Sequence, residues 1–63
     1  MHIRPYVEQA GVTFTKLAAR VGCGVSTLHD IATGRRLPSL RLASRIEVAT
    51  GGAVRPQDYI VAA

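Results

Sequence analysis

Two short amphipathic segments joined by a glycine-containing turn, residues 14–33, constrain the fold of this chain more than any other feature. Leu17 and Val21 are spaced i, i+4, which puts them on one face of a helix. Leu28 and Ile31, spaced i, i+3, form a similar face in the second segment. Helices this short are not stable alone in water, because nucleation is costly and most helical stability comes from tertiary packing. The two segments are therefore predicted to pack against each other and against neighbouring elements.

The residues between these segments predict a helix-turn-helix. Gly22 permits a backbone conformation with positive φ at the turn. We expect the first helix at about residues 14–21, with Thr13 as its N-cap. The second helix is expected at about residues 25–33, with Gly24 as a weaker but tolerated N-cap.

A later start for the second helix is also open. Thr27 with Asp30 three residues further on resembles a capping box, and this frame leaves barely two turns before Gly34. The start after Gly24 gives roughly nine residues, about 13 Å, which is enough to lie in a major groove about 12 Å wide. We therefore prefer the earlier start.

The segments on either side also have helical patterns. Pro5 suits the first position of a helix over about residues 5–10. Ser39 is the expected N-cap of a helix over about residues 40–50, and Pro56 is expected to start a last short helix. The residues expected to face the core from these segments are Ile3, Tyr6, Val7, Ala10, Leu40, Ala43, Ile46, Ala49, Val54, Tyr59 and Ile60. The whole chain, residues 1–63, is predicted to be one all-α domain.

The charge balance indicates a polyanionic partner. Eight Lys and Arg residues oppose four Asp and Glu residues, for a formal net charge of +4 and a pI near 10.3. So basic a small domain favours nucleic acid first and an anionic membrane second. The arginines are dispersed over several predicted helices rather than along one strongly amphipathic helix, which argues against a membrane surface.

Several other classes of function are disfavoured. No apolar run approaches the length needed to span a bilayer and no signal segment opens the chain, so we expect a soluble protein of the bacterial cytoplasm. Cys23, with only His2 and His29 to help, cannot complete a structural zinc site, and a buried core position is expected for it. Cys23, His29 and Asp30 are the only conceivable catalytic set, and Cys23 faces the core. We expect no enzyme activity, no metal, no cofactor and no small-molecule ligand.

Three stretches carry a resemblance to a known family. Residues 11–22 and residues 34–40 resemble the phage repressor/Cro class (XRE-like) of helix-turn-helix DNA-binding proteins. Residues 46–54, followed by Asp58 and Tyr59, are similar to prophage-encoded Cro-like and YdaS-like regulators. The resemblance implies a compact five-helix, lambda-repressor-like domain whose third helix enters the major groove. It also implies a transcription regulator, a repressor of Cro type and of phage or prophage origin, acting as a homodimer on a palindromic operator in double-stranded DNA.

The resemblance carries Val25, Ser26, His29 and Asp30 over as candidates for contact with base edges, and Thr27 joins them on its hydroxyl. Ser26 and Thr27 can donate or accept, and Val25 can contact a thymine methyl group. Asp30 can accept from cytosine N4, and His29 can donate or accept. Two alternatives stay open: Thr27 as a structural hydroxyl, and Asp30 paired with an arginine of the following connector.

The predicted contacts to the DNA backbone are Phe14, Thr15, Lys16, Arg20, Arg35, Arg36 and Arg41. Arg35 and Arg36 follow the predicted recognition helix directly, where paired guanidiniums suit phosphate binding or a narrow minor groove. Phe14 replaces the Gln often found at this position in the family, so a side-chain hydrogen bond to phosphate is lost there. The alternative for Arg20 is a solvated basic face, and for Arg35 and Arg36 a solvated loop.

A protein-interaction function is the alternative to regulation alone. The same fold can serve as an antitoxin that neutralises a partner protein and autoregulates by DNA binding. An antitoxin usually carries an extra segment that folds on its toxin, and few residues follow Gly52. We therefore place this alternative second.

Overall fold

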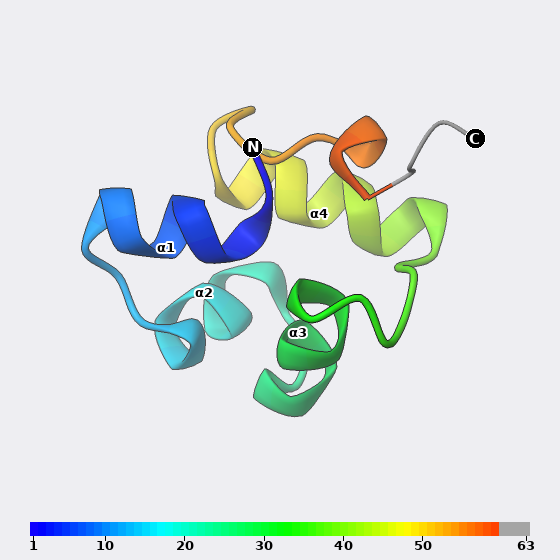
Figure 1. Ribbon diagram of the computed structural model, residues 1–63, viewed down its shortest axis with the longest axis horizontal. Helices are drawn as coiled ribbons and strands as arrows, with labels where there is room; N and C mark the ends of the chain where they lie inside the picture. Colours follow the sequence, from blue (N-terminus) through cyan, green and yellow to red (C-terminus); the bar gives the residue numbers. More distant parts are fainter. Residues whose placement is uncertain (60–63) are drawn as a thin grey trace.

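The protein is all-helical over residues 1–59, which are the residues that this computed structural model describes. The elements are α1 (Ile3–Ala10), α2 (Phe14–Val21), α3 (Val25–Ala32), α4 (Leu40–Ala49) and the 3-10 helix η1 (Pro56–Asp58) (Figure 1). Pro56 starts the last helix as expected, but η1 is a single 3-10 turn in which Tyr59 N donates to Pro56 O at 3.2 Å. The prediction of five helices is therefore not matched, because the described residues form four α-helices and this short turn.

The helix-turn-helix is formed by α2 and α3, which pack against each other. The Thr13 hydroxyl accepts from Lys16 N at 3.1 Å and caps α2, as predicted. Gly22 ends α2 with φ +86°, a value that L side chains rarely adopt. Gly24 is the N-cap of α3 and Thr33 its C-cap, so α3 ends within one residue of the predicted bound. The later start at Thr27 is wrong.

Helix α1 begins two residues earlier than the prediction from Pro5. The His2 imidazole supplies the cap, since its Nδ1 accepts from Ile3 N at 2.8 Å. Pro5 lies within the first turn of α1, where a missing N–H has no intrahelical acceptor to lose. Ala10, expected to face the core, is exposed in the last turn before the left-handed Gly11.

The core is one apolar cluster to which every helix contributes. Its buried members are Ile3, Val7, Leu17, Ala18, Val21, Leu28, Ile31, Ala43, Ile46, Val54 and Tyr59. Tyr6, Cys23 and Ala49 pack against this cluster and are half-buried. The inward prediction for Leu40 is wrong, because this first residue of α4 projects past the core and is 79% exposed. Ile60, the other core prediction, lies outside the described residues.

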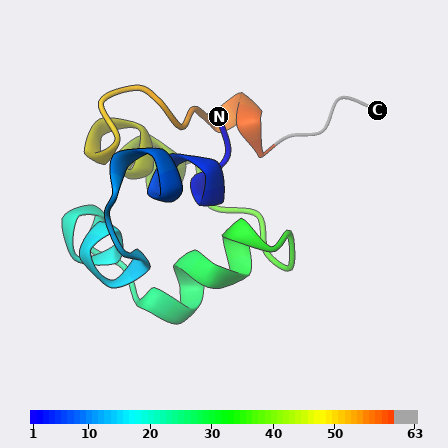
Figure 2. The same ribbon diagram turned by 60° about the vertical axis from the view of Figure 1, so that its left-hand side comes forward.

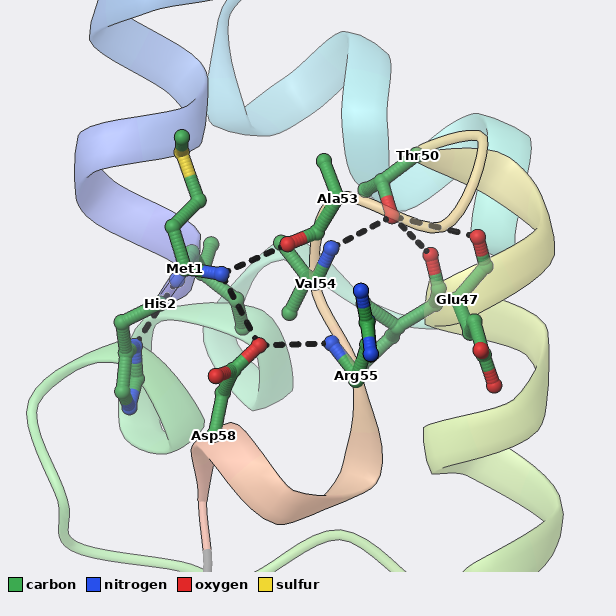
Figure 3. Close-up of polar contacts among 10 residues, drawn as sticks. Met1, His2, Glu47, Thr50, Ala53, Val54, Arg55 and Asp58 are labelled. Atoms are coloured by element: carbon green, nitrogen blue, oxygen red, sulfur yellow. Dashed lines mark hydrogen bonds and ion pairs between the residues drawn. The ribbon is translucent and has the colours of Figure 1, made fainter.

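The chain leaves α4 through a buried threonine. Thr50 Oγ1 donates to Ile46 O at 2.9 Å and accepts from Val54 N at 3.1 Å (Figure 3). These two bonds satisfy a hydroxyl that is buried within the core. They also place Val54, the first core residue after the glycines, which is completely buried.

The two ends of the described chain meet in a polar clasp. The Met1 ammonium group donates to Ala53 O at 2.6 Å and to Asp58 Oδ2 at 2.9 Å (Figure 3). The same carboxylate oxygen accepts from Arg55 N at 2.8 Å. These hydrogen bonds, that from Arg55 first, hold the pKa of Asp58 below its usual range. His2 adds an edge-on aromatic contact with Tyr59, so the clasp fixes the start of α1 beside η1.

Candidate nucleic-acid interface

Helix α3 presents a polar face to solvent at the end of the molecule opposite η1 (Figures 1 and 2). Leu28 and Ile31 are buried under it, which turns the remaining positions outward. Ser26 and His29 are exposed, and Val25 is 39% exposed. With eight residues, α3 is about 12 Å long, which matches a major groove about 12 Å wide.

Thr27 and Asp30 lie at the half-buried edge of this face. An added Cβ on Gly24 would meet Thr27 Oγ1 at 3.9 Å, so the hydroxyl lies beside the N-cap of α3. The described structure has no ion pair within 4.0 Å between Asp30 and either arginine of the connector. The pairing alternative for Asp30 is therefore wrong, and its carboxylate stays available to a partner.

The backbone of the connector is tied to the end of α3. Gly34 turns the chain with φ +83°, and the Asp30 carbonyl then accepts from Arg35 N at 2.9 Å and Arg36 N at 3.2 Å. Thr33 Oγ1 donates to His29 O at 3.0 Å and completes the end of the helix. The guanidinium groups of Arg35 and Arg36 are thereby held next to α3, on exposed side chains.

The other predicted backbone contacts divide between two places. Thr15 and Lys16 are exposed in the first turn of α2, and Arg41 is exposed in the first turn of α4. Arg20 instead lines an open depression between α2 and α4 together with Arg45. The structure therefore gathers the start of α2 with α3 and the connector, and places Arg20 beside α4.

The Phe14 ring joins α2 to α3 and α1. It is stacked on the His29 imidazole with ring centroids 4.2 Å apart and planes 9° apart. The Arg4 Cζ atom of α1 lies 5.7 Å from the Phe14 ring centroid. Arg4 therefore borders the recognition face although it is ten positions away from Phe14 in sequence.

The family assignment follows from a comparison with known proteins. A model of the helix-turn-helix domain family matches residues 1–58 of this chain. The chain belongs to the helix-turn-helix domain family. No curated protein and no solved structure matches it significantly. Membership of this family supports double-stranded DNA as the ligand of the exposed face of α3.

Two arginines of this helix-turn-helix domain escaped the reasoning from sequence. Arg4 was assigned to the solvated side of α1 and Arg45 to the outside of α4. No local pattern reveals the position of Arg4, because its neighbour Phe14 is on another helix. The only available signal was Phe14 itself, an aromatic residue at a helix start where a polar residue is usual in the resembled class.

An apolar groove lies on another side of the helix-turn-helix domain. Leu37 and Leu40 are 70% and 79% exposed on its rim. The buried Tyr59 hydroxyl has no hydrogen-bond partner among residues 1–59, and burial raises the pKa of this group, which keeps it protonated. The groove is lined by Leu37, Pro38, Leu40, Ala43, Pro56 and Tyr59.

Other chemistry finds little support in the described part of the helix-turn-helix domain. Residues 1–59 contain no group of three side chains placed to hold a metal ion. Burial raises the pKa of the Cys23 thiol, which disfavours the reactive thiolate. None of the described helices has the length and apolar character required to cross a membrane.

Proposed function

We propose that this helix-turn-helix domain, spanning residues 1–63, is a sequence-specific transcription regulator, a repressor of Cro type, that reads the major groove with α3. The observation that carries the proposal is the exposed face of α3, which bears hydrogen-bonding side chains and is bordered by cations on both sides. Short donors and acceptors read base edges, while cations along the phosphates supply most of the affinity. The net charge of +4 suits the same ligand.

The proposed base contacts are Val25, Ser26, Thr27, His29 and Asp30. Ser26 and His29 have the most exposed polar groups, so they are the main specificity determinants in this proposal. Val25 provides apolar contact with a thymine methyl group. Asp30 penalises sequences that offer its carboxylate no donor, which sharpens the choice of site.

The proposed backbone contacts surround α3. Thr15 and Lys16 approach phosphates from the start of α2, and Arg35 and Arg36 approach them from the connector. Arg41 extends the connector side onto α4. Arg20 is a weaker member of this set, because it lies beside α4 rather than beside Lys16.

A second copy of the chain is the proposed occupant of the apolar groove. Two copies, each with a net charge of +4, repel one another, and they meet most favourably through a surface without charged side chains. The groove lining carries no charged side chain. It also begins at Leu37, directly after Arg36, so a dimer formed there places both connectors near its two-fold axis. Such a dimer suits a palindromic operator.

Selection from a random duplex library tests the proposal. We expect an enriched palindrome with half-sites about 34 Å, or one turn, apart, and two chains per duplex by sedimentation. Ser26→Ala should change the preference at one or two positions, by roughly 1–3 kcal/mol each. Arg55→Ala, which removes a cation beside η1, should select the unchanged site.

The outcome also separates the antitoxin alternative. The exposed groove is the observation that favours it, because a partner protein can cover the same leucines. Enrichment of no motif at low salt would contradict sequence-specific regulation and favour the interaction module. A motif without two-fold symmetry, bound by one chain, would contradict the proposed dimer.

A further inference from the structure

Three helices converge on the Phe14 ring at the edge of the recognition face. Phe14 is the first residue of α2, His29 comes from the middle of α3, and Arg4 comes from the first turn of α1. The His29 and Phe14 rings are nearly parallel, at 9° with a centroid separation of 4.2 Å. The Arg4 guanidinium carbon lies 5.7 Å from the same phenyl centroid, within the range of a cation–π contact.

The stacking restricts the orientation of the His29 imidazole. A histidine in mid-helix with an exposed side chain normally samples several rotamers. Here one face of the imidazole is covered by the Phe14 ring, while the residue as a whole stays exposed. The ring edge with its nitrogen atoms therefore points along a fixed plane. A polar edge held in one orientation is suited to reading a base edge without first losing side-chain entropy.

The Arg4 charge is not neutralised by a neighbouring carboxylate. Glu8 follows one turn later on α1, yet within residues 1–59 no ion pair shorter than 4.0 Å joins it to Arg4. Arg4 is exposed, and the Phe14 ring lies against its guanidinium. A guanidinium supported by an aromatic ring and free of carboxylates is suited to bind a phosphate.

We propose that Arg4, Phe14 and His29 form one DNA-contacting unit, in which Arg4 binds a backbone phosphate and Phe14 positions the imidazole of His29 at a base edge. This inference rests on the proposed function, because it specifies how the same DNA is held. Phe14 then acts as a positioning residue through its two neighbours. Helix α1, which sequence reasoning assigns to packing alone, contributes a cation to the interface.

The test of Arg4 is the salt dependence of binding to the selected duplex. Arg4→Ala should lower the magnitude of the slope of log K against log salt by about 0.9, the value for one phosphate contact. Arg55→Ala, which removes the same charge beside η1, should leave the slope unchanged. Equal slopes for Arg4→Ala and the parent chain would overturn the assignment of Arg4.

The test of Phe14 is the base preference. Phe14→Leu keeps an apolar side chain but removes the stacking, so it should relax the preference at the same base position as His29→Ala. The double variant should relax it no further, because both changes disable one contact. Phe14→Tyr, which retains the ring face, should restore the parent preference. Circular dichroism melting of each variant establishes that the chain is folded.

The outcomes separate this unit from the proposed function. If the parent chain selects a palindrome and Phe14→Leu selects the same site with unchanged preference, the positioning role is overturned and the proposed function stands. If the folded Phe14→Leu and His29→Ala variants relax different positions, the coupling is overturned as well. If the parent chain enriches no motif, the proposed function fails and the unit fails with it.

Discussion

At the scale of single residues, periodicity orders the faces of α3 but tertiary contacts decide how each side chain is held. Ser26 and His29 both face solvent, as the spacing of Leu28 and Ile31 requires. Only His29 has an aromatic ring stacked on it. The two are therefore expected to differ as DNA contacts, with Ser26 adapting to the base and His29 pre-oriented.

The connector arginines give a prediction at this scale. Arg35→Ala and Arg36→Ala should each lower the magnitude of the salt slope by about 0.9, because each removes one phosphate contact. Binding should weaken for all duplex sequences alike, since phosphate contacts carry no sequence information. The measurement is a series of binding isotherms at increasing salt, with Arg55→Ala as the charge-matched control. An unchanged slope in the double variant would assign both side chains to a solvated loop.

At the scale of elements, the two glycines around the turn have different physical roles. Gly22 has φ +86°, whereas Gly24 has φ −72° and ψ 148°, an extended conformation open to every residue. An added Cβ on either glycine meets its nearest atom at 3.9 Å, which is an ordinary contact. Backbone conformation, and not space, therefore distinguishes the two positions.

This difference predicts opposite effects of substitution on stability. Gly22→Ala should lower the free energy of unfolding by about 1–2 kcal/mol, because an L residue is strained at positive φ. Gly24→Ser should raise it by a few tenths of a kcal/mol, because the hydroxyl can cap α3 and the unfolded chain loses freedom. Urea unfolding at matched m-values measures both. A stabilising Gly22→Ala would contradict the role assigned to the turn.

At the scale of the whole molecule, the polar clasp links the start of the chain to η1. Met1 and Asp58 are far apart in sequence and form an ion pair at 2.9 Å. The clasp holds the N-terminus of α1, and α1 packs on α3. The position of Arg4 at the interface therefore depends on contacts at the opposite end of the molecule.

The clasp predicts a pH-dependent stability. The folded-state pKa of Asp58 is lowered from 3.8, so its contribution is complete above that pH and is lost as the pH falls through the lower folded value. Asp58→Asn should lower the free energy of unfolding by about 0.5–1 kcal/mol at neutral pH, the range of a partly exposed ion pair. Chemical denaturation at neutral and acidic pH measures this difference. A difference that persisted unchanged into strong acid would contradict the charge-based explanation.

Local features were predictable wherever they depend on neighbours along the chain. The bounds of α2 and α4, the caps Thr13 and Ser39, and the cores of both helices follow from residue spacing and capping chemistry. The composition predicts a polyanionic ligand for the same reason, since charge is a sum over residues. The exposed polar face of α3 follows once Leu28 and Ile31 are turned inward.

Contacts between distant segments were not predictable, because they depend on how the helices pack. His2 caps α1 at a start that Pro5 concealed, and Leu40 projects past a core that its spacing suggested it would enter. The stacking of Phe14 on His29 and the approach of Arg4 require the relative positions of three helices. The sequence by itself thus determined the helices and the chemistry of the recognition face, through local spacing and charge. Only the tertiary structure decided which side chains from other helices border that face.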